Sequence, residues 1–261
     1  MSGLLILCPL PEEAAGVVAR LTDRGVARIA GVEAAWRGRL GGRAALVCVT
    51  GDGPSRAGAG ARASLGEGAG AVLVAGVGGG LAPGLDPGAL IVATSILDEA
   101  TGARADCASA AALAATLDAE AAPVVTALHV AATPGARERL RGAARPAPAV
   151  VDLESWALVA AARAAGRAWA VLRAISDAAD ESLPAYLEGC RDEGGSVRRA
   201  AVMRAALVRP WTLPALTGMR ARVAACAAVL ADACERVAAS DWPAAAKDPG
   251  LARTDSIGFR E

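Results

Sequence analysis

Two carboxylates, Glu154 and Asp177, stand where a predicted β-strand gives way to the next element. The segments Val150–Leu153 and Trp169–Ile175, each mostly apolar, predict these two strands. At the start of a helix the dipole favours ionised Glu154, and an ionised carboxylate accepts hydrogen bonds from a pair of sugar hydroxyls. Asp177 can point into the same crevice and serve as an acid. The alternative interpretation is local: Glu154 is a helix N-terminal charge and Asp177 is a turn cap.

The histidine and cysteine content excludes several kinds of catalysis. His129 is the only histidine, which argues against His-ligated zinc, Ser-His-Asp triads and paired-histidine catalysis. Acid–base work therefore falls to carboxylates, and no metal site is expected. The six cysteines are scattered without a C-x-x-C spacing, so we interpret them as buried apolar residues in a reducing cytoplasm.

Two glycine-rich turns are expected at strand ends, Gly51–Pro54 and Gly76–Gly80. Their backbone N–H groups could approach an anion or a sugar closely, with Gly53, Gly78 and Gly79 as the candidate donors. Neither turn matches a Walker loop or a dinucleotide fingerprint, so each is equally readable as a plain tight turn. Arg56, after the first turn, could supply a cation for phosphate; otherwise it is a solvated arginine at a helix start.

Strand and helix patterns alternate along the chain. The predicted strands are Leu4–Leu7, Arg43–Thr50, Ala71–Val77, Leu90–Thr94, Val124–Val130, Val150–Leu153 and Trp169–Ile175, and the predicted helices are Glu12–Arg20, Ala57–Leu65, Ala108–Leu117, Ser155–Ala165 and Ala215–Val237. This alternation predicts an α/β fold that holds its ligand at strand ends. We predict a single domain over residues 1–240 and a loosely held tail over residues 241–261.

Composition excludes several classes of function. The 261 residues carry 27 basic and 27 acidic side chains, so the net charge gives no case for nucleic acid. Aromatic residues make up 3%, which argues against base-stacking platforms, and hydrophobic residues make up 54%, enough for a sizeable core. No basic region precedes the N-terminal apolar run and prolines interrupt it, so a signal peptide is not expected. No spanning helix is expected either. The expected location is the cytoplasm.

The carboxylate segments resemble those of the purine nucleoside phosphorylase and methylthioadenosine/adenosylhomocysteine nucleosidase superfamily. Val151–Ser155 (VDLES) resembles the family's V-E-M-E-[AS] segment, and Arg173–Asp177 (RAISD) resembles its R-A-[IV]-S-D segment. Pro9–Glu13 (PLPEE) is similar to A-M-E-E-E of the nucleosidases, and Ala75–Pro83 (AGVGGGLAP) to the T-G-S-A-G-G-L-A-P turn. The resemblance covers residues 4–182 and implies a three-layer, single-domain enzyme with a central mixed sheet flanked by helices. It also implies a homodimer.

The resemblance implies roles for residues on the sugar side. Glu154, next to Leu153, would bind the ribose hydroxyls, and Glu13 would orient or deprotonate the attacking water. Arg173 would pair with a carboxylate and order the crevice. The chemistry needs no metal and no organic cofactor.

On the purine side, the resemblance makes Asp177 the acid that protonates N7. Asp177 must then hold a proton at working pH, so burial or a hydrogen bond with Ser176 has to favour its neutral form. The nucleosidases stack adenine on a Phe that has no counterpart here. His129 lies near that position, either as a base-stacking group or as a packed strand residue.

A closer branch, the hopanoid-associated phosphorylases, looks similar in Asp152, in Glu154-Ser155 and in the run Ser176–Pro184. Its Arg-rich C-terminal region also resembles Val197–Leu216. This branch implies a lipid-linked adenine nucleoside, adenosylhopane, as the substrate. It also implies that the enzyme binds peripherally to the inner face of the membrane. The alternatives are an ordinary methylthioadenosine/adenosylhomocysteine nucleosidase, a non-catalytic nucleotide-binding module on the same scaffold, and a dinucleotide-dependent oxidoreductase, whose glycine fingerprint is missing.

Residues 194–240 form a basic segment with interleaved apolar residues. Its arginines before Ala231 are Arg198, Arg199, Arg204, Arg209, Arg220 and Arg222. A basic segment with an apolar face and Trp211 suits peripheral contact with anionic lipid. The same pattern also suits a helix pair packed on the sheet or on a second subunit.

The nucleophile stays open between phosphate and water. Val77 stands where relatives often have a hydroxyl that helps hold phosphate or ribose, and Glu12-Glu13 stand where the hexameric phosphorylases place an arginine. Both departures favour water, whereas Arg56 would favour inorganic phosphate as a co-substrate.

Overall fold

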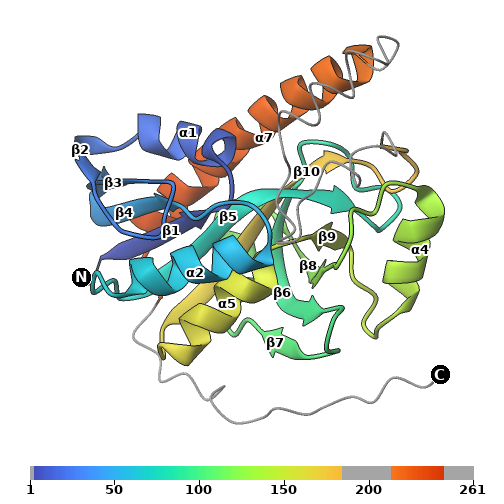
Figure 1. The fold of residues 1–261 in the computed structure, drawn as a ribbon, viewed down its shortest axis with the longest axis horizontal. Helices are drawn as coiled ribbons and strands as arrows, with labels where there is room; N and C mark the ends of the chain where they lie inside the picture. The colour runs from blue at the N-terminus through green and yellow to red at the C-terminus, as the bar shows by residue number, and fades with distance from the viewer. Residues whose placement is uncertain (1–2, 184–212, 244–261) are drawn as a thin grey trace.

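The computed structural model describes residues 3–183 and 213–243, which build one mixed β-sheet with helices on both faces (Figure 1). The strands are β1 (Leu4–Cys8), β2 (Thr22–Ala27), β3 (Ala34–Leu40), β4 (Arg43–Val49), β5 (Ala71–Gly80), β6 (Leu90–Asp98), β7 (Arg104–Asp106), β8 (Glu120–Thr126), β9 (Val150–Asp152) and β10 (Ala168–Asp177). The helices are α1 (Pro11–Ala19), α2 (Pro54–Leu65), α3 (Ala110–Leu117), α4 (Pro134–Gly142), α5 (Ser155–Ala164) and α7 (Leu213–Ala239).

The middle of the sheet is parallel. β1 pairs in parallel with both β4 and β5, and β5 pairs in parallel with β10. Beyond β4, antiparallel β3 and β2 extend the sheet to one edge. On the other side β10, β6, β8 and β9 lead back to β5, so these strands close into a barrel. The carboxyl ends of β1, β5 and β10 therefore meet at one place.

Helices cover both faces of the parallel strands. α1 and α7 pack together on one face, and α2 and α5 lie side by side on the other (Figure 1). Leu4–Cys8 of β1 and Ala71–Ala75 of β5 are buried throughout. Strands buried on both faces are near-continuous apolar runs, which is why the sequence predicts them well. The predicted three-layer α/β fold is confirmed.

α7 packs closely on α1. A Cβ at Gly16 of α1 would lie 2.8 Å from the carbonyl oxygen of Ala227 and 3.0 Å from Cβ of Ala231, so a larger residue there would push the two helices apart. The buried face of α7 includes Cys226, Leu230, Cys234 and Val237. Within the basic segment, the part from residue 221 to residue 239 thus packs on the domain. Residues 194–212 lie outside the described residues, so membrane contact there stays a prediction.

The second residue of the predicted tail, Trp242, is buried. Trp242 donates a hydrogen bond from its indole N–H to Oγ of Ser109 over 2.8 Å, and its carbonyl accepts one from Arg43. The remaining tail, from residue 244, lies outside the described residues. None of the described helices is long and apolar enough to cross a membrane.

Some elements differ from the sequence predictions. β2, β3, β7 and α4 were not predicted, because charged residues and glycines interrupt them and none is a continuous apolar run. The strand expected at Val124–Val130 is wrong at both ends: β8 runs from Glu120 to Thr126. Its parallel partner β6 begins pairing at Ile91 opposite Glu120, which sets the register. β6 itself extends past the predicted end to Asp98.

Candidate active site

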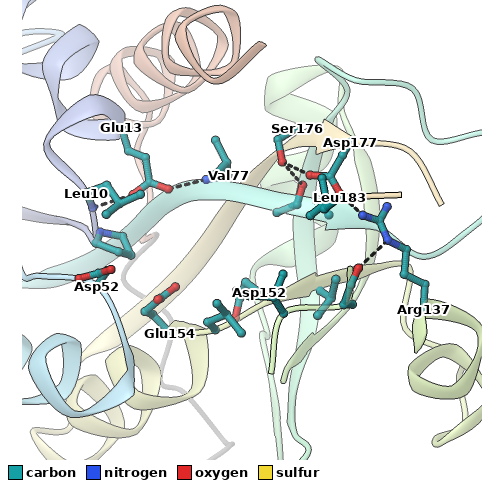
Figure 2. A pocket seen from close by; sticks show the side chains of 17 residues that line it. Leu10, Glu13, Asp52, Val77, Arg137, Asp152, Glu154, Ser176, Asp177 and Leu183 are labelled. Atoms are coloured by element: carbon teal, nitrogen blue, oxygen red, sulfur yellow. Dashed lines mark hydrogen bonds and ion pairs between the residues drawn. The ribbon is translucent and has the colours of Figure 1, made fainter. Parts of the chain in front are cut away.

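A pocket lies at the carboxyl ends of β1, β5, β9 and β10 (Figure 2). It is lined by Pro9, Leu10, Glu13, Asp52, Val77, Gly78, Gly79, Val130, Ala131, Arg137, Val151, Asp152, Leu153, Glu154, Ser176, Asp177 and Leu183. This is the strand-end location at which open α/β sheets bind ligands. Glu13, Glu154, Leu153, Ser176 and Asp177, all singled out from the sequence, meet in this pocket.

Glu13 lies in the first turn of α1 and is buried. Its Oε2 accepts a hydrogen bond from Leu10 N over 2.9 Å, and its Oε1 accepts one from Val77 N over 2.8 Å. The residue is 2% exposed. Burial raises the pKa of Glu13 to about 7, against the opposing effects of Arg173 and of the two backbone donors. A carboxylate with a pKa near neutrality is suited to accept a proton from water.

A buried ion pair lies beneath this end of the pocket. Nε of Arg173 is 2.8 Å from Oδ2 of Asp152, and its Nη2 donates to Oγ of Ser155 over 2.8 Å. The other oxygen of Asp152 accepts hydrogen bonds from Thr126 Oγ1 and Ser155 N. Burial acts to lower the pKa of Arg173, but the nearby carboxylates, with Asp152 first, raise it overall. Arg173 stays charged and links β10 to the start of α5.

Glu154 stands at the N-terminus of α5, on the pocket wall. Its Oε1 accepts a hydrogen bond from Gly53 N over 2.9 Å. Gly53 has φ of 80° and precedes Pro54 at the start of α2, a conformation that favours glycine. The amide of Gly53 therefore orients the Glu154 carboxylate, and it is this side chain, rather than a bound phosphate, that the Gly53 N–H faces here.

Arg56 does not reach the pocket. Its guanidinium is 3.8 Å from Oε1 of Glu33, and the two side chains are 57% and 44% exposed. The position of Arg56 therefore does not support the hypothesis that it binds phosphate. A helix-start arginine points outward here because α2 presents its other face to α5.

The glycine run Gly76–Gly80 is strand, not turn. These residues continue β5, where Ile175 and Asp177 of β10 pair with Gly78 and Gly79. A Cβ at Gly76 would lie 2.1 Å from Nη1 of Arg173 and 2.8 Å from Oε1 of Glu13, and one at Gly79 would lie 2.9 Å from Oδ2 of Asp177. The glycines make room for the polar side chains packed against them, so the expected turn at Gly78 and Gly79 is wrong. Both residues line the pocket, and an anion-binding role for them stays a prediction.

Asp177 closes the other end of the pocket. Its Oδ1 lies 2.5 Å from Ser176 Oγ, and its Oδ2 forms an ion pair with Nη2 of Arg137 (Figure 2). Asp177 is 5% exposed and Arg137 is 1% exposed. The position of Arg137 was not predicted, because nothing in the polar run of α4 distinguishes it from Arg139 or Arg141. Asp52, Val130 and Ala131 were likewise not predicted to line the pocket.

His129 is exposed and does not line the pocket, although the following residues Val130 and Ala131 do. The base-stacking role considered for it has no support from this position. In the described part of the chain, no cluster of three or more His, Cys, Asp or Glu side chains could hold a metal ion.

The fold is that of a nucleoside phosphorylase or nucleosidase. The chain belongs to the phosphorylase superfamily, whose family model matches residues 4–209. This match confirms the predicted class of enzyme. Comparison with curated protein sequences finds no match.

Solved structures share the fold at low sequence identity. The 5'-methylthioadenosine/S-adenosylhomocysteine nucleosidase of S. pneumoniae is 15% identical, with a TM-score of 0.70 over 91% of this chain and 98% of that one. Futalosine hydrolase of Helicobacter pylori strain 26695 is 17% identical, with a TM-score of 0.69 over 90% and 96%. The S-adenosylhomocysteine nucleosidase of Streptococcus pyogenes, in complex with 5-methylthiotubericidin, is 17% identical, with a TM-score of 0.69 over 90% and 95%.

Proposed function

We propose that this chain cleaves the N-glycosidic bond of an adenine nucleoside. The observation that carries the proposal is a pair of buried carboxylates, Glu13 and Asp177, at opposite ends of one pocket, with Glu154 on its wall. Two carboxylates in different environments suit one base and one acid.

The bond between C1′ and N9 breaks with its electron pair moving to the purine. Asp177 gives a proton to N7 and so neutralises the leaving base, a contribution on the order of 10²- to 10⁴-fold for positioned acid catalysis. Glu154 holds the 2′- and 3′-hydroxyls and stabilises the positive charge that builds up on the sugar. Glu13 accepts a proton from the water whose oxygen bonds to C1′.

Water is favoured over phosphate as the nucleophile. Among the described residues that line the pocket, Arg137 is the one cationic side chain, and it lies at the Asp177 end. The Glu13 end carries Asp52 and Glu154, whose charges would repel phosphate. No organic cofactor or metal has a role in this reaction.

The substrate we propose is adenosylhopane, on the basis of the sequence resemblance described above. The apolar lining of the pocket, which includes Leu10, Val77, Val130 and Leu183, supports a nucleoside with an apolar substituent. The proposal includes a homodimer in the cytoplasm, with peripheral membrane contact through residues 194–212.

The test is release of adenine from adenosylhopane in liposomes, with and without inorganic phosphate, beside methylthioadenosine in solution. Release without phosphate from the lipid substrate supports the proposal in full. Release that requires phosphate refutes water as the nucleophile. If methylthioadenosine alone reacts, the hopanoid assignment is wrong and a soluble-substrate nucleosidase replaces it. Purine binding without turnover of either substrate would instead indicate a binding module.

A further inference from the structure

We propose that Thr126 is a positioning residue for ribose recognition: its hydroxyl caps the N-terminus of α5 in place of Glu154, whose carboxylate is thereby kept for the pocket. Thr126 itself does not line the pocket. The inference rests on the proposed function, in which Glu154 binds the two ribose hydroxyls. It assigns a part in that step to a residue of β8 that lies outside the pocket lining.

The first support is the way in which α5 begins. Glu154 is the N-cap residue, a position whose side chain commonly accepts a hydrogen bond from an amide of the first helical turn. Here the Glu154 side chain makes no cap hydrogen bond; its carboxylate lies on the pocket wall and accepts one from Gly53 N over 2.9 Å (Figure 2). The first amides of α5 therefore need acceptors from elsewhere in the fold.

Two other side chains supply those acceptors. Oδ1 of Asp152 accepts a hydrogen bond from Ser155 N over 3.1 Å, and Oγ1 of Thr126 accepts one from Trp156 N over 2.9 Å. Trp156 is the second residue of the helix, and its amide is one that an N-cap side chain ordinarily binds. Thr126 therefore occupies the place that the carboxylate of Glu154 would otherwise take.

Neighbouring side chains fix the orientation of the Thr126 hydroxyl. β8 and β9 pair in parallel with Thr126 beside Asp152, and the hydroxyl donates to Oδ1 of Asp152 over 2.9 Å. Asp152 is held in turn by Arg173, whose Nε lies 2.8 Å from its Oδ2. Thr126 and Asp152 are both buried. Because a hydroxyl has one proton to donate, this bond leaves a lone pair of the oxygen to face Trp156 N.

Removal of the Thr126 hydroxyl leaves the amide of Trp156 without this acceptor. An unsatisfied amide away from water is costly, and the carboxylate of Glu154 can satisfy it by turning toward its own helix, where the dipole also favours a negative charge. That movement takes the carboxylate away from the ribose hydroxyls and leaves the purine end of the pocket as it is. The loss of affinity should therefore depend on whether the ligand carries those hydroxyls.

The experiment compares Thr126→Val, which keeps the branched shape, with Thr126→Ser, which keeps the hydroxyl. Adenosine and 2′,3′-dideoxyadenosine compete with whichever of adenosylhopane and methylthioadenosine the enzyme cleaves faster, and their inhibition constants are measured. For Thr126→Val we expect the constant for adenosine to rise by roughly 10- to 100-fold, since a positioned hydrogen bond to a charged group is lost. The constant for the dideoxynucleoside should rise by no more than about threefold. Thr126→Ser should stay close to the wild type with both ligands.

Two controls separate this role from general support of the fold. Thr101 also donates to a carboxylate, that of Asp98, over 2.6 Å and accepts a hydrogen bond from Ala103 N over 3.2 Å, but this amide belongs to the turn between β6 and β7. Thr101→Val should leave both inhibition constants unchanged. Glu154→Ala should show the same selective loss, and Thr126→Val should then add little to it, because both changes act on one contact.

Three results overturn the inference. The first is a rise by the same factor for adenosine and for 2′,3′-dideoxyadenosine, the second is a Thr126→Val enzyme that binds adenosine as the wild type does, and the third is an additive loss in the double variant. If circular dichroism shows that Thr126→Val does not fold, Thr126→Ala replaces it in each comparison. The proposed function fails separately, if the wild-type enzyme releases adenine from neither adenosylhopane nor methylthioadenosine.

Discussion

The two ends of the pocket hold their carboxylates by different means. Glu13 is buried with two backbone N–H donors, and burial raises its pKa to about 7. Asp177 is buried to a similar degree, yet it faces the guanidinium of Arg137 and the hydroxyl of Ser176. The comparison shows that one pocket can hold two buried carboxylates in different electrostatic environments, through the partner that each carboxylate meets.

The largest expected effect comes from the Asp177 end. Asp177→Asn removes the proton donor while keeping the size of the side chain, so kcat for base release should fall on the order of 10²- to 10⁴-fold. Steady-state kinetics on the preferred nucleoside measures this loss. Asp106→Asn, at an exposed position far from the pocket, is the matched control and should keep wild-type kcat. A fall of less than tenfold for Asp177→Asn would remove Asp177 from the mechanism.

At the Glu13 end, we expect a pH-dependent stability. The folded protein holds a proton on Glu13 up to about pH 7, whereas the unfolded chain releases it near the ordinary value of 4.5. Between these values the folded state binds more protons, so its free energy of unfolding should fall as pH rises from about 4.5 to above 7, by up to about 3 kcal/mol. Urea titrations at pH 5 and pH 8 measure the difference.

Glu13→Gln should abolish that fall in stability, since a glutamine does not titrate. Glu12→Gln, at an exposed position next to it, should retain the wild-type dependence. If the free energy of unfolding of Glu13→Gln fell with pH as in the wild type, another group would be responsible. The pKa of Glu13 would then not distinguish the two ends of the pocket.

Glycines of β5 lie against side chains at both ends of the pocket, with Gly76 next to Glu13 and Gly79 next to Asp177. Gly76→Ala places a methyl group against Arg173 and Glu13, and overpacking of this kind costs roughly 1–3 kcal/mol in stability. Gly25→Ala in β2 has open space around its Cβ and should change stability by less than about 0.5 kcal/mol. Chemical denaturation of both variants tests the difference. If Gly76→Ala and Gly25→Ala had equal free energies of unfolding, β5 would be able to shift at no cost, and the packing around Gly76 would not be tight.

The smallest effect is expected from Ser176→Ala. Its hydroxyl lies 2.5 Å from Oδ1 of Asp177 and 3.3 Å from the carbonyl of Gly78, and loss of one such hydrogen bond is typically worth about 1 kcal/mol. We expect kcat to fall by about fivefold. A loss as large as that of Asp177→Asn would mean that Asp177 cannot act without the hydroxyl of Ser176.

Much of the fold was predictable because the parallel strands are buried on both faces. The runs Leu4–Leu7 and Ala71–Val77 carry no charged or polar side chain, Trp169–Ile175 is interrupted only by Arg173, and all three lie within strands. The half-exposed strands β2 and β3 have no such signal, and their pairing depends on contacts with β4. The run Gly76–Gly80 was misread since glycine favours turns in isolation, whereas here it prevents collisions with side chains from other elements.

The sequence by itself determined the α/β fold and the position of Glu154 and Asp177 at strand ends, because apolar runs and strand ends are local features of the chain. The tertiary structure alone decided what each carboxylate faces. Arg137 and Asp177 are 40 residues apart, and they meet only because α4 packs beside the end of β10. Arg139 and Arg141 on the same helix have the same side chain as Arg137. The orientation of α4 decides that Arg137 is the one that is buried. A local pattern cannot encode that choice, since it depends on which helix face the fold turns inward.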